Sequence, residues 1–234
     1  MHIVKFASSK LLIYPLHTAK NNRALTITEN IKFLGMHLDH NLTWKSHIDN
    51  LFKKLNSICL MLRKLLHTVF LKMLPMVYFA HFYSQISYGI IFWGSSSSVR
   101  NVSIIRNKAI RIMLRLGPRN HCREGFKKLD VLTVPYLCIY ALMLHAVKYL
   151  NIYQTNSSVH GMNTRQQNEL HIPLVRMSSI QRGVYCSPVK IFSQLPQKIF
   201  KFHNNIHTFK DYLVKNAFYF NKEFLSTGHN DVDI

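Results

Sequence analysis

The sequence has few acidic residues and few cysteines, and each shortage excludes a class of protein. Only 10 residues are Asp or Glu against 30 Lys or Arg, which gives a net charge of +20. An excess that large favours polyanionic partners such as nucleic acid or an acidic membrane surface. The four cysteines are far apart and form no C-x-x-C pair, so neither a zinc knuckle nor a disulfide framework is indicated. No secretory signal is recognisable at the N-terminus. We therefore expect an intracellular protein, cytoplasmic or nuclear.

Long uncharged runs are limited to two stretches, residues 73–99 and 131–147. Either could span a bilayer by length. The first contains Pro75, His81 and a run of serines, while the second contains Pro135 and His145. Buried helices of a soluble domain are the preferred interpretation and a membrane span is the alternative. We expect no membrane partner.

The carboxylates that could bind catalytic metals are also scarce. Phosphoryl transfer by two metal ions needs a cluster of carboxylates on a rigid scaffold. Asp231 and Asp233 are close in sequence but fall in a predicted frayed tail. Four residues, His37, Asp39, His40 and His47, have two interpretations. They could bind a metal ion, or they could be exposed turn residues beside a helix cap, which we prefer. No phosphate-binding loop or nucleophile motif occurs. We therefore predict no catalytic residue and no metal site.

The pattern of apolar residues predicts an α+β fold that is mainly α. Short segments rich in β-branched and aromatic residues, HIVKF, LLIY, ALTIT and IKFLGMHL, predict strands and hairpins up to residue 39, with Gly35 interrupting the last one. Helical spacing follows at about 44–66, 71–93, 98–116 and 135–150. Beyond a predicted loop at 153–168, a strand at IPLVRM, a short helix at VYCSPVKIFSQLP and a last helix at IHTFKDYLVKNAFYF predict a small C-terminal α/β region.

Two details of these helices remain open. Either Thr43 caps the first helix, or Ser46 and Asp49 form a capping box a turn later. The aromatic residues of the second helix could stack on bases, but so dense a cluster in an uncharged helix is more typical of a core, which we prefer. These residues are Tyr78, Phe79, Phe82, Tyr83, Tyr88, Phe92 and Trp93.

The predicted helix at 98–116 separates apolar from cationic residues. Val102, Ile105, Ala109, Ile112 and Leu116 share one face, and Arg100, Lys108, Arg111 and Arg115 lie opposite. Arg119 and Arg123 extend the positive charge, and no acidic residue occurs between Arg100 and Glu124. This face is either a surface that contacts nucleic-acid phosphates or a solvated helix face. The charge balance of the chain favours the first.

Several motifs, in order, resemble the C-terminal part of reverse transcriptases from jockey-like non-LTR retrotransposons. They are IKFLGMHLDHNLTWKSHI, HFYSQISYGIIFWGSS, IIRNKAIRIMLRLGPR, FKKLDVLTVPYL, Asn163-Thr164-Arg165 and VKIFSQLP. The resemblance implies three segments: remnant palm strands at 1–40, a thumb-like helical bundle at 41–152 and a connection-like region at 153–234. It also implies that Phe33, Leu34 and Gly35 match the primer-grip turn, and that the thumb closes on the minor-groove side of a template–primer duplex.

The chain departs from that family in ways that bear on activity. The aromatic-Ala-Asp-Asp box would lie before Met1, so magnesium would be bound by the missing palm and this chain is predicted to hold no cofactor and to be inactive alone. Arg106 stands where the family usually has Gln, and Met162 where it often has Tyr. Our leading hypothesis is a truncated RNA-directed DNA polymerase of a mobile element. It would bind RNA or DNA, duplex or single-stranded, through backbone contacts, and would accept a palm-containing polymerase fragment as a partner. The alternatives are an unstable remnant without function and a membrane protein.

Overall fold

The computed structural model describes residues 2–3, 19–20, 23–24, 26–68, 70–161, 167, 169–193 and 206–215. The fold is mainly helical with a small N-terminal antiparallel hairpin, as the sequence predicts. It divides into two compact units, one formed by Met1–Gly89 with Ser96–Leu129 and the other by Ile90–Ser95 with Asp130–Ile234. The second unit therefore begins mainly at residue 130, whereas the resemblance puts the border between the thumb-like and connection-like segments at residue 152. The assignment of the segments to palm, thumb and connection stays a prediction.

A two-residue turn joins the strands of the hairpin. Strand β5 (Asn30–Phe33) pairs antiparallel with β6 (Met36–Asp39), and Phe33 is opposite Met36. The two turn residues, Leu34 and Gly35, have φ of 46° and 80°, and positive φ at both positions is typical of a type I′ turn. Gly35 therefore closes a hairpin where the sequence suggested a single interrupted strand.

Further short strand pairs precede the hairpin. Strand β1 (His2–Ile3) pairs parallel with β4 (Thr26–Ile27), and β2 (Ala19–Lys20) pairs antiparallel with β3 (Arg23–Ala24). The strand predicted at LLIY lies outside the described residues.

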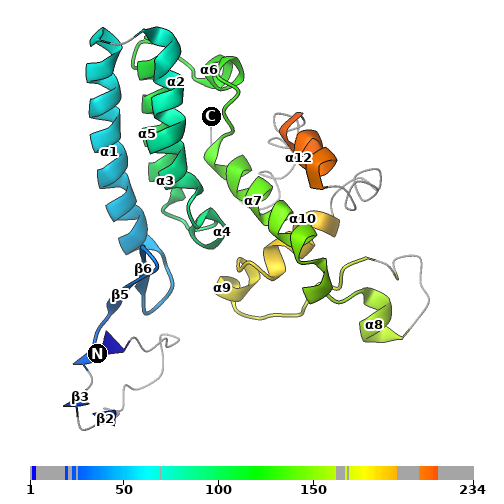
Figure 1. The fold of residues 1–234 in the computed structure, drawn as a ribbon. Coiled ribbons are helices and arrows are strands. Elements are labelled where there is room, and N and C mark those ends of the chain that lie inside the picture. Colours follow the sequence, from blue (N-terminus) through cyan, green and yellow to red (C-terminus); the bar gives the residue numbers. More distant parts are fainter. Residues whose placement is uncertain are drawn as a thin grey trace. The chain divides into compact units, whose positions relative to one another are not determined.

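Three helical segments form an up-down-up bundle in the first unit (Figure 1). Helix α1 (Lys45–Thr68) packs along α5 (Val99–Met113). Between them the chain returns through η1 (Leu71–Met73), α2 (Leu74–Val77), the π-helical turn η2 (Tyr78–Tyr83) and α3 (Ser84–Ser87). The core lies between the three segments, and α6 (Arg123–Lys128) follows α5.

The second predicted helix, 71–93, is broken. It ends at Tyr88, which is extended, and Gly89 has a positive φ of 62° before α4 (Ile90–Trp93) begins. The aromatic residues along it divide between core and surface. Tyr78, Phe82 and Trp93 are fully buried, as predicted, whereas Phe79, Tyr88 and Phe92 are exposed.

At the start of α1 the Thr43 hydroxyl, one of the two predicted caps, accepts from the Lys45 N–H at 3.5 Å, and Asp39 orders the residues just before the helix. The Asp39 carboxylate accepts hydrogen bonds from the Thr43 N–H at 2.9 Å and the Trp44 N–H at 3.0 Å. Burial alone would raise the pKa of Asp39, but these bonds, together with one from the Thr43 hydroxyl, outweigh it and lower the pKa. Because the helix begins at Lys45, a capping box starting at Ser46 is wrong.

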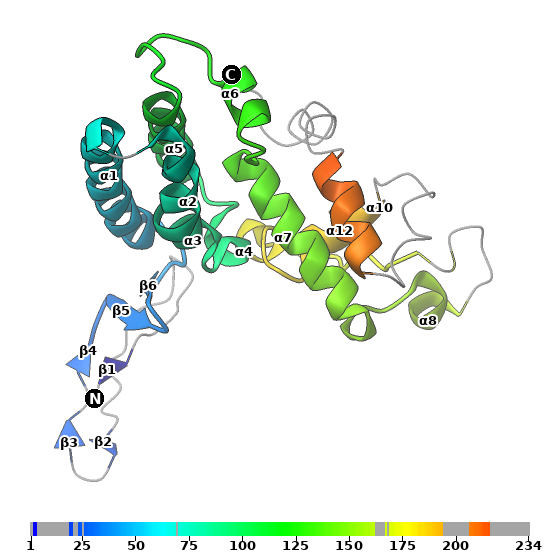
Figure 2. The ribbon, with the colours of Figure 1, turned by 45° about the horizontal axis from the view of Figure 1, so that its top comes forward.

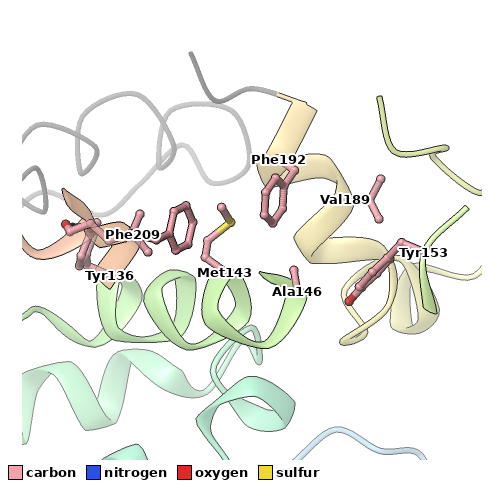
Figure 3. Close-up of a cluster of buried hydrophobic side chains, with 8 residues drawn as sticks. Tyr136, Met143, Ala146, Tyr153, Val189, Phe192 and Phe209 are labelled. Atoms are coloured by element: carbon pink, nitrogen blue, oxygen red, sulfur yellow. Dashed lines mark hydrogen bonds between the residues drawn. The ribbon is translucent and has the colours of Figure 1, made fainter. Parts of the chain in front are cut away.

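The second unit is built on α7 (Val134–Lys148), against which α10 (Cys186–Ser193) and α12 (Ile206–Lys215) both pack (Figure 2). Figure 3 shows the apolar cluster between them, to which α7 contributes Tyr136, Met143 and Ala146. Partners from other segments are Tyr153, Val189, Phe192, Phe209 and Leu213. This unit also contains α4 and the short elements η3 (Leu150–Ile152), α8 (Asn156–His160) and α9 (Ser178–Gln181).

Two expectations for the second unit are wrong. Helix α8 lies inside the segment predicted as a loop, where the Thr155 hydroxyl accepts from the Ser158 N–H and Gly161 ends the helix. Residues 172–177, predicted as a strand, form no strand, and the nearest ladder contact is an isolated bridge between Thr155 and Leu170. A strand needs a neighbouring strand to satisfy its backbone, and the described part of this unit offers none. Of the last predicted helix, residues 216–220 lie outside the described ones.

Across the described residues, no helix combines the length and apolar character that a membrane crossing needs.

Candidate nucleic-acid interface

Helix α5 buries one side and exposes cations on the other. Val102, Ile105, Ala109 and Ile112 are buried, as the helical period predicts. Arg100 is exposed, while Lys108 and Arg111 are half-buried. Ile104 lies among these cations and is 56% exposed, so an apolar side chain that the sequence analysis did not single out is part of this surface.

Arg115 leaves the helix instead of continuing its cationic face. The Leu116 N–H donates to the Arg111 carbonyl at 2.9 Å and the Arg115 N–H to the Ile112 carbonyl at 3.2 Å. These two bonds form a Schellman motif, in which Arg115 takes the left-handed position with φ 53°. The predicted helix therefore ends three residues early, at Met113. The Arg115 guanidinium reaches α1, where Nη2 lies 3.4 Å from the Leu66 carbonyl.

Arg111 holds the connection that follows α5. Its Nε donates to the Asn120 carbonyl at 3.0 Å, and the Cys122 thiol lies 3.6 Å from the Asn107 carbonyl. Arg119 belongs to this connection and is exposed. Of the five cations predicted to bind nucleic acid, Arg111 and Arg115 thus also bond the backbone of their own unit. In the described part of the chain, the side chains of Arg100, Lys108 and Arg119 make no hydrogen bond or ion pair.

Helix α1 adds a cation that the sequence analysis did not assign to this surface. The Cys59 thiol is buried where α1 meets α5, with Sγ 3.9 Å from the Ile105 carbonyl. Burial raises its pKa to about 11, and Lys108 and Arg63 act in the opposite direction. Both cations therefore act electrostatically on the same thiol, one from each of two packed helices. We define the seam surface as Arg63, Lys108 and Arg115 together with Ile104 and Arg100, which are exposed one and two turns before Lys108 on α5.

One arginine of α5 faces the core. Arg106 is fully buried, and its Nε donates to the Tyr78 hydroxyl at 2.9 Å. Its guanidinium carbon lies 5.9 Å from the Tyr83 ring and 6.0 Å from the Phe126 ring. Both terminal nitrogens lack a hydrogen-bond partner among the described residues. Arg106 is therefore not available to an external phosphate.

The three residues matched to a primer grip lie at the tip of the β5–β6 hairpin. Phe33 is 57% and Leu34 69% exposed, and the Tyr88 hydroxyl bonds the Leu34 carbonyl. Beside the tip is a hollow of about 270 Å³. It is lined by Gly35, His37, His47, Asn50, Leu51, Lys54, Ser84, Gln85 and Tyr88. A turn is present where the resemblance places one, and its role as a primer grip stays a prediction.

Metal ligands are not grouped in the described part of the chain. No cluster of three or more His, Cys, Asp or Glu residues there could hold a metal ion. The His37 N–H donates to Nδ1 of His47 at 3.4 Å, and the Asp39 carboxylate is used by Thr43 and Trp44. Asp231 and Asp233 lie outside the described residues.

Comparison of the chain with protein-family models, with curated proteins and with solved structures finds no match.

Proposed function

We propose that this chain binds nucleic acid through the seam surface, without sequence preference, as the C-terminal part of a jockey-like non-LTR reverse transcriptase. The ordered motifs of the sequence support the kinship. The observation that carries the binding is that α1 and α5 pack along each other at Cys59 and Ile105, which places Arg63 of α1 and Lys108 of α5 on neighbouring helices. Cations held side by side on packed helices can contact successive phosphates of one strand.

The kind of contact follows from the residue types. Lysine and arginine on a helix face bind phosphate oxygens and release condensed counterions, which gives affinity without sequence selection. Ile104, exposed between Arg100 and Lys108, suits an apolar contact with sugar rings. Contacts of these cations with phosphate oxygens carry no sequence information. We therefore infer binding to duplex or single-stranded RNA or DNA, with no chemical step by this chain alone.

A salt titration tests the proposal. We expect the affinity for a primer–template duplex to fall as salt rises, because each released counterion adds about 0.9 to the slope of log K against log salt for a duplex. Replacing Arg63, Arg100 and Lys108 with alanine removes cations that form no hydrogen bond or ion pair in the described part of the chain. The slope should then decrease by about 2 to 3.

A matched control changes the same charge elsewhere. Arg176, Arg182 and Lys190, all exposed in the second unit, are replaced with alanine, which also lowers the net charge by three. The slope of log K against log salt for this control variant should stay close to that of the original chain. Equal slopes for the seam variant and the original chain would refute the seam surface as the binding site.

A remnant without function is the second candidate, because the first unit exposes apolar side chains where a larger protein would cover them. Phe70, Met73, Met76 and Phe79 are all exposed along η1, α2 and η2. A surface of this kind favours association. A cooperative thermal transition in a monomer would argue against the remnant, and aggregation on purification would support it. A palm-containing fragment that prevents the aggregation would instead identify a partner in trans.

A further inference from the structure

A second basic site lies beside the connection between α5 and α6, next to Arg115 of the seam surface. A hollow of about 520 Å³ is formed there, within the usual volume of small-molecule sites. It is lined by Leu114, Leu116, Arg119, Asn120, His121, Glu124, Gly125 and Lys128.

Hydrogen bonds and close packing hold the walls of this hollow. The Asn120 N–H bonds the Gly117 carbonyl at 3.1 Å, and the Asn120 carbonyl accepts from Arg111. Helix α6 sits tightly on α5, since a Cβ on Gly125 would lie 2.8 Å from side-chain carbons of both Ile110 and Leu114. The hollow is therefore part of the packed fold.

The polar side of the hollow suits an anion. Arg119 and Lys128 carry permanent charges and His121 adds a donor. The side chains of Arg119 and Lys128 make no hydrogen bond or ion pair in the described part of the chain. Glu124 is the one carboxylate in the lining, and it lies 3.4 Å from the Lys127 amine, which is outside the lining. The hollow thus carries net positive charge, and phosphate is bound well by arginine and lysine together.

Another part of the lining is apolar. Leu114 and Leu116 line it, and leucine side chains can cover a planar ring that is attached to an anion. A nucleotide combines both features, since it has a phosphate at one end and a flat base whose faces can pack on leucine at the other. We propose that this hollow binds one nucleotide, its phosphate on Arg119 and Lys128 and its base against Leu114 and Leu116. The proposed function supplies the source of that nucleotide, either free or in a single strand.

Calorimetric titration of the full chain with adenosine 5′-monophosphate tests the site. Replacing Arg119 and Lys128 with alanine should weaken binding at least about tenfold, which corresponds to about 1.4 kcal/mol. The control replaces Arg123 and Lys72, exposed cations of the same unit that do not line the hollow, and should change the affinity by less than about twofold. Equal losses in both variants would overturn the site. All the replaced residues are exposed, and a thermal melt checks that each variant folds.

Simpler probes test the two walls separately. Inorganic phosphate and adenosine should each bind more weakly than the mononucleotide, and Leu116→Ser should weaken the mononucleotide but not phosphate. Phosphate binding as tightly as the mononucleotide would overturn the role of the apolar wall.

Competition distinguishes the two sources of the nucleotide. A short oligodeoxythymidylate that displaces the mononucleotide assigns the hollow to a strand, and one that binds without displacing it assigns the hollow to a free nucleotide. The seam variant, Arg63, Arg100 and Lys108 to alanine, should keep mononucleotide binding. A chain that binds no duplex through the seam surface can therefore still bind the mononucleotide in the hollow, so the two proposals fail independently.

Discussion

At the scale of single residues, Arg106 carries a permanent charge into the core of the first unit. The desolvation of such a cation costs several kcal/mol, and attraction to the Tyr83 and Phe126 rings returns about 2 kcal/mol. Its Nε bond to Tyr78 satisfies one donor and leaves both terminal nitrogens without a partner among the described residues. The family that the sequence resembles usually has a glutamine here, which would bring the same kind of donor without the charge.

Arg106→Gln is expected to stabilise the chain. The amide can still donate to the Tyr78 hydroxyl, and no buried charge remains, so we expect the free energy of unfolding to rise by about 1 kcal/mol or more. Urea denaturation followed by circular dichroism measures it. Tyr78→Phe, which removes the one polar partner of Arg106, should lower stability by about 1–3 kcal/mol. A destabilised Arg106→Gln protein would show that the guanidinium is well compensated.

Arg115 tests backbone strain and binding together. Its φ of 53° is the left-handed region that favours glycine. Arg115→Gly and Arg115→Ala remove the same guanidinium, but only the first relieves the backbone. The glycine variant should be more stable than the alanine variant by about 1 kcal/mol, in thermal or urea unfolding. Both should bind duplex equally, and a difference between them in duplex affinity would contradict the assigned role of the side chain.

The sequence predicts whether a residue is buried or exposed only as far as the helical period allows. Spacing along α5 identified Val102, Ile105 and Ala109 as buried. The same spacing puts Arg106 on the buried side, four residues after Val102 and three before Ala109, and only the expectation that arginine is exposed hid it. Arg63 could not be found this way, because a single sequence does not say which helices pack together.

At the scale of elements, Gly94 allows α4 to approach α7. A Cβ there would lie 2.5 Å from the Ile90 carbonyl oxygen and 2.6 Å from the Cys138 sulfur. Gly94→Ala must move the backbone, so we expect the free energy of unfolding to fall by about 1–3 kcal/mol. Gly117→Ala is the matched control, since a Cβ at Gly117 would lie 3.4 Å from its nearest neighbour, the Asn120 side-chain oxygen. Equal melting temperatures for the two variants would contradict tight packing at Gly94.

The type of an element was predictable where its apolar period extends over many residues. The boundary of an element was not predictable where one specific residue sets it. Helix α1 extends over 24 residues with a steady apolar stripe, and its existence follows from spacing alone. Its start depends on Asp39 reaching Thr43 and Trp44, a contact that needs the preceding hairpin. The break at Tyr88 and Gly89 was missed because an isolated glycine inside an apolar run is compatible with a helix.

At the scale of the whole molecule, the charge of +20 opposes compaction because like charges repel. With 10 acidic residues against 30 basic ones, most cations have no carboxylate to pair with. A sequence shows this imbalance directly, but it does not show where the cations gather. The seam surface and the hollow at α6 depend on the packing of α1, α5 and α6.

Salt and nucleic acid should therefore stabilise the chain through two effects that can be measured separately, screening of repulsion and binding to the folded chain. Raising sodium chloride from low to moderate concentration screens repulsion and should raise the melting temperature of the original chain and the seam variant alike. A duplex at low salt that binds the folded chain more tightly than the unfolded chain should add up to about 2.7 kcal/mol at one hundred times its dissociation constant. The seam variant should lose most of that second increase at the same duplex concentration. If duplex stabilises both proteins equally, the nucleic acid acts through net charge alone and not through Arg63, Arg100 and Lys108.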